Sequence, residues 1–178
     1  MKRLALLMSS LLVFALAGCN GTDVPNSAPL NSVISEENVD TLATKYKMVE
    51  IQGIGEVYAA KLLDAGVKYT DDYLKFAGKR KDREALAKKT GISTKLLLEW
   101  ANHVDLMRIK GIGPKQSNLL EEAGVDSIKE LSHRLSDNLY PALEKANKAK
   151  NLVNRMPSTT QVKQWLDDSK KMQSSVEE

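Results

Sequence analysis

Apolar residues recur at steps of three and four positions along most of the chain after residue 35, which is the spacing of one face of an α-helix. In the stretch TKLLLEWANHVDLM, which follows Ser93, this spacing includes Leu97, Trp100 and Val104. In QVKQWLDD near the end of the chain, a similar stripe includes Trp165. No run of alternating β-branched residues indicates a strand. The pattern predicts an all-α fold with both tryptophans in the core.

Capping residues mark the starts of several of these helices. Ser127 with Glu130, and Ser158 with Gln161, have the spacing of a capping box, in which each side chain bonds the backbone near the other. Ser35 is followed by two acids, which is typical of a first helical turn because carboxylates stabilise the positive end of the helix dipole. We therefore expect helices to begin at these three serines.

The helical region contains a duplication. Residues 53–67 read GIGEVYAAKLLDAGV and residues 111–125 read GIGPKQSNLLEEAGV, and the two align without gaps. Each copy predicts a tight glycine turn followed by a helix, which ends at Gly66 or Gly124 in the left-handed conformation that glycine favours. A unit this small buries its apolar face best against its twin, so we expect one compact domain.

The turn itself, a hydrophobe-x-Gly-hydrophobe-Gly sequence between two helices, resembles the helix-hairpin-helix motif. Glycines at both ends of such a turn allow positive φ, which we expect at Gly55 and Gly113, and leave no side chain between backbone and ligand. The turn amides and the following helix N-terminus can then point at one phosphate oxygen. Ile54 and Ile112 are expected to anchor the two turns in the core.

The two copies differ in the residues that flank the turn. The candidate phosphate-binding residues belong to the second copy and are Lys110, Gly111, Ile112, Gly113 and Lys115. The first turn (Gly53, Ile54 and Gly55) has Gln52 and Glu56 at the corresponding flanks, and a carboxylate repels phosphate. We expect the first turn to be structural. The same interpretation, a sharp joint between packed helices, stays open for the second.

A longer resemblance covers roughly residues 44–172. The segments MVEIQGIGEVYAAKLLDAGV, TGISTKLLLEWANHVDLMRIKGIGPKQSNLLEEAGV and NLVNRMPSTTQVKQWLDDSKK resemble a bacterial family with tandem helix-hairpin-helix-like units. That family is catalogued as a domain of unknown function. The resemblance therefore implies two such units packed as one helical domain, and it implies no activity.

The amino terminus has the pattern of a signal peptide, in which two cations precede an apolar stretch too short to span a membrane. The sequence Leu16-Ala17-Gly18-Cys19 resembles the lipobox of bacterial lipoproteins, in which the cysteine receives a diacylglycerol. An ordinary secretory signal with a chance cysteine is the alternative. Asn20 after the cysteine favours the periplasmic face of the outer membrane if the host is Gram-negative.

These observations divide the chain into five segments. They are a lipoprotein signal peptide (1–18), a flexible tether from the lipidated cysteine (19–34), a first helix-hairpin-helix-like unit (35–108), a second such unit (109–173) and a polar tail (174–178). The tether is expected because the segment after Cys19 contains prolines and little that could form a core.

Charge argues against a protein built for nucleic acid. The net charge is +3, but cleavage before Cys19 would remove two cations and leave 24 basic against 23 acidic residues, or about +1. Proteins that live on nucleic acid usually carry a clear basic excess. Two local basic clusters occur at residues 79–89 and 145–155. Each is either a solvated helix face or part of a surface, shared with Lys110 and Lys115, that binds DNA or anionic envelope lipids.

Residue patterns for catalysis are missing from the sequence. His103 and His133 are the only histidines and lack the spacing of a metal site. The adjacent acids Glu121-Glu122 and Asp167-Asp168 lie on predicted helices, where neighbouring residues do not face one another. Cys19 is the only cysteine. We expect no catalytic residue, no metal and no cofactor, and hence a protein that is not an enzyme.

Two functional hypotheses remain from the sequence. The first is a lipid-anchored, non-catalytic binding or scaffolding module of the cell envelope, which contacts the membrane through acyl chains and binds an envelope protein or an anionic envelope component. The second is an extracytoplasmic DNA-binding protein that uses the second glycine turn on backbone phosphate. Near-neutral charge favours the first and predicts weak DNA binding.

Overall fold

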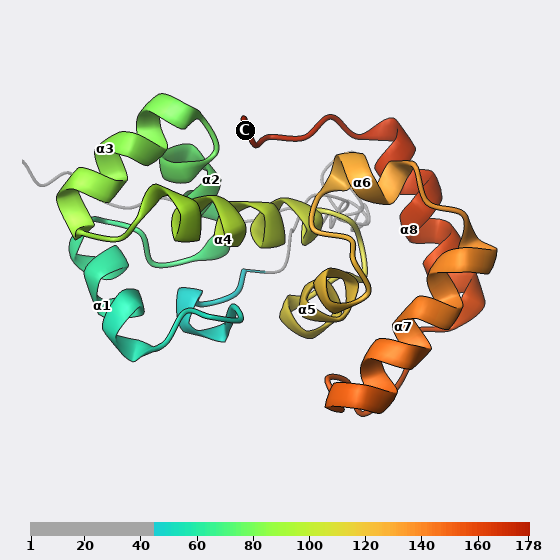
Figure 1. The fold of residues 1–178 in the computed structure, drawn as a ribbon. Helices are drawn as coiled ribbons and strands as arrows, with labels where there is room; N and C mark the ends of the chain where they lie inside the picture. Colours follow the sequence, from blue (N-terminus) through green and yellow to red (C-terminus); the bar gives the residue numbers. More distant parts are fainter. Residues whose placement is uncertain (1–44) are drawn as a thin grey trace, which may run out of the picture. The chain divides into compact units, whose positions relative to one another are not determined.

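The computed structural model describes residues 45–178. Within that range the chain forms eight α-helices and one 3-10 helix, with an isolated antiparallel bridge between Lys47 and Tyr69 and no strand (Figure 1). The prediction of an all-α fold is confirmed. The signal peptide, the tether, Cys19 and the helix start expected at Ser35 lie outside the described residues. None of the described helices has the length and apolar character needed to cross a bilayer.

The duplication extends over four helices in each unit. The first unit contains η2 (Met48–Glu50), α1 (Glu56–Asp64), α2 (Thr70–Ala77), α3 (Arg80–Thr90) and α4 (Thr94–Leu106). The second contains α5 (Pro114–Glu122), α6 (Ile128–Ser132), α7 (Ser136–Lys150) and α8 (Thr159–Lys171). Helices α1 to α4 correspond in order to α5 to α8. The sequence alignment had detected only the first part of this correspondence.

Equivalent helices end in the same way. After α1, Gly66 has φ +95°, and after α5, Gly124 has φ +82°, so the left-handed conformation expected at both is confirmed. The amide of Val67 donates to the carbonyl of Leu62 at 2.8 Å, as expected for a helix that closes on a left-handed glycine. Helices α3 and α7 also end in left-handed residues, Gly91 and Asn151.

The two capping boxes predicted from the sequence lie at the starts of α6 and α8. The Ser158–Gln161 capping box at the start of α8 is confirmed in both directions, at 3.2 and 2.9 Å. At α6 the Ser127 hydroxyl accepts from the Glu130 amide at 3.3 Å, but the Glu130 carboxylate bonds the amide of Asp126 and not that of Ser127. The local sequence therefore fixes where these helices start.

The core consists of two apolar clusters, one in each unit. Trp100 is 2% exposed and belongs to the first cluster, whereas Trp165 is 1% exposed and belongs to the second. The core position predicted for both is confirmed. The half-buried side chain of Met107 packs against both clusters. Because α4 contacts α2 and α3 of its own unit and α5 and α6 of the other, it links the two clusters.

The segment after α8 returns to the first unit. Figure 1 shows the chain leaving α8 and ending beside α2 and α3. Ser174 donates to the carboxylate of Asp105 at 2.7 Å, and the amide of Glu177 donates to the carbonyl of Gly78 at 2.9 Å. We call residues 174–178 the strap. The sequence had indicated only that this segment is polar, and these contacts show that it is packed against the first unit.

Candidate functional site

The two glycine turns have nearly the same backbone. Positive φ occurs at the first glycine of each, Gly53 at +81° and Gly111 at +87°. The prediction of positive φ at Gly55 and Gly113 is wrong, because these residues have φ of −77° and −107°. Both are the N-cap residues of the helices that follow, and a helix N-cap takes an extended conformation that any residue can adopt.

A tryptophan lies against each first glycine. A Cβ atom on Gly53 would stand 3.2 Å from Nε1 of Trp100, and one on Gly111 would stand 3.3 Å from Nε1 of Trp165. Each tryptophan follows its capping serine, Ser93 or Ser158, by seven residues, a repeat that the sequence shows on inspection. Two constraints therefore favour glycine at the first position of each turn. The backbone has positive φ, and the indole beneath leaves little room for a Cβ atom.

The polar groups at the mouth of the second turn are engaged within the chain. The amide of Gly113 donates to Oε1 of Gln116 at 3.3 Å, and the amide of Ile112 donates to the carbonyl of Ile109 at 3.0 Å. Pro114 has no amide hydrogen. In addition, a Cβ on Gly113 would lie 2.9 Å from the hydroxyl of Tyr46, which covers this face.

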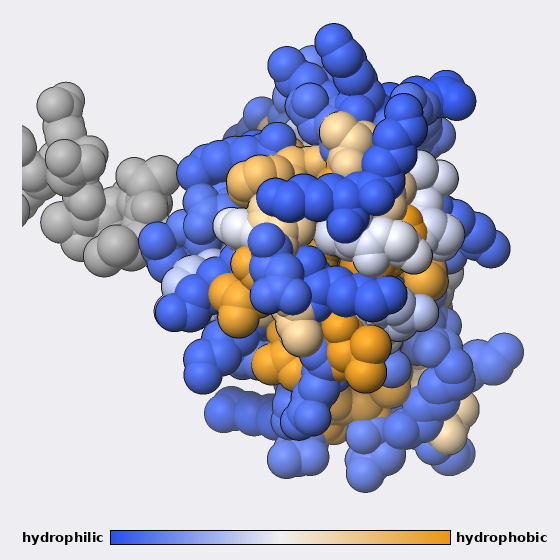
Figure 2. Space-filling model, turned by 90° about the vertical axis from the view of Figure 1, so that its left-hand side faces the viewer, coloured by the Kyte–Doolittle hydropathy of each residue, from blue (hydrophilic) through white to orange (hydrophobic). Residues whose placement is uncertain are grey.

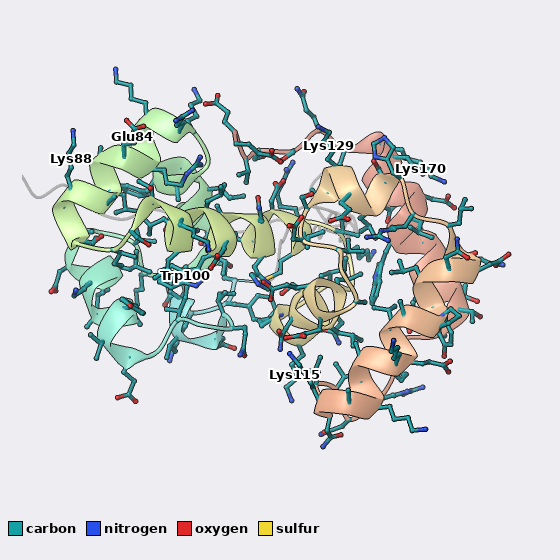
Figure 3. The ribbon with its side chains drawn as sticks, in the orientation of Figure 1. Glu84, Lys88, Trp100, Lys115, Lys129 and Lys170 are labelled. Carbon is teal, nitrogen blue, oxygen red and sulfur yellow. The ribbon has the colours of Figure 1, made fainter. Side chains whose placement is uncertain are left out.

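The flanking cations of the second turn remain at the surface. Lys110 and Lys115 are exposed, and Figure 3 shows Lys115 below α5. Ile112 is 3% exposed, so its predicted role as the core anchor of the turn is confirmed. The candidate phosphate site therefore offers exposed ammonium groups, but Gly113 and Ile112 already use their amides.

The first turn is open where the second is covered. Nothing approaches within 4 Å of a Cβ placed on Gly55. Gln52 and Glu56 are exposed beside it, and Ile54, at 3% exposed, is buried in the first cluster. The exposed carboxylate of Glu56 stands at the N-terminus of α1, where an anionic ligand would have to approach. This geometry agrees with a structural role for the first turn.

The outward faces of α1 and α5 differ most. Val57 is 71% exposed and Leu63 is 55% exposed on α1, and the corresponding positions on α5 are Lys115 and Glu121. Figure 2 shows apolar side chains among polar ones on the side of the molecule that carries α1 and α3. We call Val57 and Leu63, which lie about 120° apart around the helix axis, the α1 stripe. It is the largest chemical difference between the two copies.

On α5, Glu121 at the position of Leu63 packs against α4 together with Ser117, whereas Lys115 at the position of Val57 is exposed. Nδ1 of His103 lies 3.3 Å from the Ser117 hydroxyl, and its Nε2 lies 3.0 Å from the Glu121 carboxylate. The hydrogen bond from His103 holds the pKa of Glu121 below its usual value, against the opposing effect of burial. Ser117 is fully buried and donates to the carbonyl of Pro114. The three side chains therefore join α4 and α5.

The basic clusters lie in different places. Figure 3 shows Lys88 on α3 at the left of the picture and Lys115 below α5 near its centre. Lys150 of the α7 cluster pairs with Glu122 at 2.5 Å. Arg83, which the sequence placed in a solvated charge run, is only 3% exposed. Among residues 45–178, no group of three or more metal-ligating side chains comes together.

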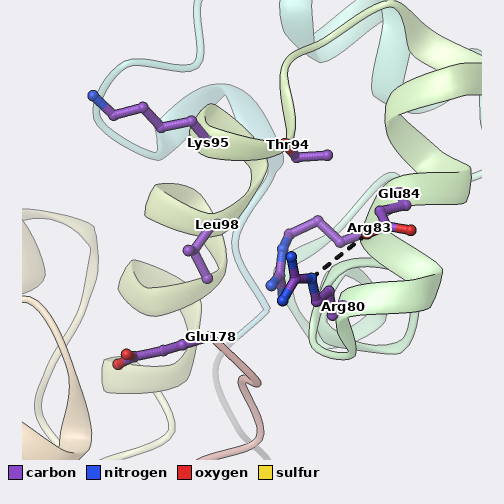
Figure 4. A pocket seen from close by; sticks show the side chains of 7 residues that line it. All are labelled: Arg80, Arg83, Glu84, Thr94, Lys95, Leu98 and Glu178. Atoms are coloured by element: carbon purple, nitrogen blue, oxygen red, sulfur yellow. Dashed lines mark ion pairs between the residues drawn. The ribbon is translucent and has the colours of Figure 1, made fainter.

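A shallow pocket of about 300 Å³ lies between α3 and α4, beside the end of the strap. Arg80 and Arg83 extend from α3 toward α4, and Leu98 and Glu178 lie on the other side (Figure 4). Arg80 also pairs with Glu84 at 3.6 Å. This pocket could not be predicted from the sequence, because Glu178 comes from the end of the chain and meets α3 and α4 only in the fold.

The fold and these sites define a duplicated all-α domain of two four-helix units, each with a glycine turn seated on a tryptophan. The model of the family described as "Domain of unknown function (DUF4332)" matches residues 32–172, and the chain belongs to this family. No curated protein and no solved structure matches the chain. The strap lies beyond the residues that the family model matches.

Proposed function

We propose that the protein is a lipid-anchored, non-catalytic binding or scaffolding module of the cell envelope, built on two helix-hairpin-helix-like units. The lipobox-like sequence that ends at Cys19 supports the anchor. The engaged amides of Ile112 and Gly113 and the cover provided by Tyr46 support a structural use of the second turn. Both glycine turns then serve as joints, and the ligand binds elsewhere.

The observation that carries this proposal is the α1 stripe. Two large apolar side chains at 71% and 55% exposure are unusual on a helix whose duplicate packs polar residues against α4. Exposed acids, Glu56 and Asp64, stand at the two ends of α1. Lys61, on the same helix, lies 6.0 Å from the centre of the Tyr58 ring. The fitting partner is an envelope protein with an apolar patch bordered by basic groups.

Cross-linking and capture of the intact protein from its own envelope test this surface. Val57→Asp with Leu63→Asp should abolish capture of the partner, because two charges replace the apolar contact. The matched control is Leu135→Asp, which changes another exposed leucine (66% exposed) in the second unit and should leave capture intact.

Two outcomes would refute this surface as the docking site. Equal capture by both variants would refute the α1 stripe as the docking surface. Since Val57 and Leu63 are exposed, the double variant should keep its melting temperature. A marked fall in melting temperature would indicate that another part of the same chain covers the stripe, which would also refute the proposal.

The anchor has its own test. Cys19→Ser should leave the protein unprocessed or release it from membranes, because stable attachment requires more than one acyl chain. If this variant, with its signal removed, still fractionates with membranes after a high-salt wash, the lipoprotein assignment is wrong. In a Gram-negative host we expect the wild-type protein at the periplasmic face of the outer membrane.

DNA binding through the second turn is the alternative function. The exposure of Lys110 and Lys115 favours it, since a few cations suffice for weak, salt-dependent binding to phosphates. The internal hydrogen bonds of the turn amides oppose it. An anionic envelope component would compete for the same lysines.

A further inference from the structure

Burial alternates along the strap and the two residues before it, with a bend at Ser175. Met172, Ser174 and Val176 are half-buried, whereas Gln173, Ser175 and Glu177 are exposed. Alternation with a period of two is the mark of an extended segment that presents every second side chain to a surface. Val176 packs against the apolar cluster of the first unit. The strap therefore contacts the first unit as a bound peptide would.

Two buried charges of opposite sign hold this segment. Asp105, 1% exposed, accepts from the hydroxyl of Ser174 at 2.7 Å and from the amide of Ser175 at 3.2 Å. Arg83, 3% exposed, donates to the carbonyl of Glu177 at 2.6 Å. Buried charges are costly unless they are hydrogen-bonded. The strap thus supplies part of the hydrogen bonding that these two side chains need.

The chain provides further partners for both charges. Arg83 also donates to the carbonyls of Ala77 and Gly78, and Asp105 also pairs with Arg108 at 2.6 Å. Both side chains would therefore stay in place and partly satisfied if the strap left. The surface that they form is consequently a preformed groove and not a product of the strap.

Most contacts in the groove are made to the backbone of the occupant. The amide of Glu177 donates to the carbonyl of Gly78 at 2.9 Å, and a Cβ on Gly78 would stand 2.6 Å from the carbonyl oxygen of Ser175. The absence of a side chain at Gly78 is thus what lets a peptide backbone pass. Backbone contacts give affinity for any extended segment, and the inward side chains give specificity.

At its end the groove favours an acidic occupant. The backbone amide of Arg80, in the first turn of α3, donates to the carboxylate of Glu177 at 3.3 Å. The pocket beside Glu178 is lined by Arg80, Arg83 and Lys95 against a single acid of its own, Glu84 (Figure 4). Charge and shape together specify a small hydroxyl residue, then an apolar residue two positions later, then acidic residues.

We propose that this groove, between the α2–α3 junction and α4, is a binding site for an extended peptide segment of a partner protein, and that the strap is its resident internal ligand. A segment with the hydroxyl, apolar and acidic pattern binds when the strap is displaced. This site is distinct from the α1 stripe, so the two proposals stand or fall separately.

The test uses the full-length chain and a synthetic peptide of residues 171–178 with a fluorophore at its amino end. A strap-release variant, Ser174→Asp with Val176→Asp, places a carboxylate against Asp105 and removes the apolar contact. The matched control is Gln173→Asp with Ser175→Asp, which adds the same charge at outward positions. Fluorescence anisotropy measures peptide binding, and circular dichroism with melting curves checks folding.

The strap-release variant should bind the peptide at least about tenfold more tightly than the wild-type protein or the control variant. A tethered strap has an effective concentration on the order of millimolar, and a site that is free only a small fraction of the time loses affinity by that fraction. Asp105→Asn in the release background should weaken binding again by about tenfold, since charge-assisted hydrogen bonds are lost. A folded release variant that binds no better than wild type would overturn the proposal.

A second measurement applies if the release variant does not fold. In the wild-type protein, hydrogen exchange at the amides of Ser175 and Glu177 should be far faster than in α4, because a displaceable strap opens locally. Exchange of these amides only at the rate of the α4 core would show that the strap is an integral part of the fold. That result would also overturn the proposal.

Discussion

The two glycine turns have the same backbone in different surroundings. In each, the first glycine takes positive φ above a buried tryptophan, and the isoleucine between the glycines is in the core. Around this shared frame, Gly55 is open to its surroundings whereas Gly113 is covered by Tyr46. The helix that follows exposes valine and leucine in the first copy and packs serine and glutamate against a histidine in the second.

The difference shows that a glycine motif determines the backbone conformation of a turn but does not determine what the turn binds. The residues that the two copies share are those that the backbone requires. Among the residues that differ, Leu63 meets solvent in the first copy, whereas Glu121 at the same position meets α4 in the second. A ligand that requires the turn amides would need them unoccupied, and in the second copy Gly113 and Ile112 already donate theirs within the chain.

The strongest test of the shared backbone is at the first glycines. Gly53→Ala and Gly111→Ala should each lower the free energy of unfolding by about 1–3 kcal/mol, because positive φ strains any residue with a Cβ. The added Cβ also presses on the indole of Trp100 or Trp165. Thermal and denaturant unfolding of the full-length protein measure the loss. If either variant is as stable as wild type, the two turns do not share the geometry described.

The pairing of α5 with α4 distinguishes the second copy and depends on pH. Glu121→Gln should lower the free energy of unfolding by about 0.5–1 kcal/mol near neutral pH, a modest effect because the carboxylate is 39% exposed and screened by solvent. Since the pKa of Glu121 is lower in the folded than in the unfolded chain, its stabilisation is complete above the usual value of 4.5.

This contribution is then lost as the pH falls through the lowered pKa of the folded state. The difference between wild type and Glu121→Gln should therefore vanish in strongly acidic solution. Denaturant unfolding at several pH values measures it, with Glu144→Gln on the exposed face of α7 as the control. A difference that stays constant into acid would contradict the pairing with His103.

The second glycines should show a smaller contrast. Gly113→Ala places its Cβ 2.9 Å from the Tyr46 hydroxyl, whereas Gly55→Ala meets nothing within 4 Å. Both lose the preference of a helix N-cap for glycine over alanine. Because a tyrosine side chain can shift, we expect Gly113→Ala to cost only about 0.5 kcal/mol more than Gly55→Ala. A double-mutant cycle with Tyr46→Ala should remove this excess, and an excess that persists would place its cause elsewhere.

DNA binding should be the smallest effect. Fluorescence anisotropy with a labelled duplex should give a dissociation constant of roughly 10⁻⁴–10⁻⁶ M at physiological salt. The affinity should fall steeply as the salt concentration rises. Lys110→Glu with Lys115→Glu should reduce this weak binding, and Gln52→Glu in the first copy should not. Submicromolar binding abolished by the double lysine variant would instead make the second turn a DNA site.

The sequence predicted most of the local structure. The apolar spacing located the helices, the serines at positions 93, 127 and 158 cap three of them, and Gly66 and Gly124 end two others. These features depend on neighbours within one or two helical turns, so the sequence contains the information. It placed positive φ at the wrong glycine of each turn, because the N-cap role of the second glycine depends on where the following helix begins.

The surface roles of charged residues were predicted least well. Arg83 belongs to a run of charges that reads as a solvated face, yet its guanidinium is buried and binds three carbonyls. Asp105 lies on an amphipathic helix with no sign that its carboxylate is buried. The strap, which arrives from the other end of the chain, supplies part of the hydrogen bonding of both.

The sequence by itself determined that this protein is helical, that it is duplicated, and that both tryptophans and the isoleucines of the two turns lie in the core. Periodicity and capping are local and act over a few residues. The tertiary structure alone decided that Tyr46 covers Gly113, that His103 meets Glu121, and that Ser174 binds Asp105 from 69 positions away. Such contacts form because packing brings distant backbone segments together. A hydrogen-bonding side chain could bond many different groups, and only the fold determines which of them is close enough.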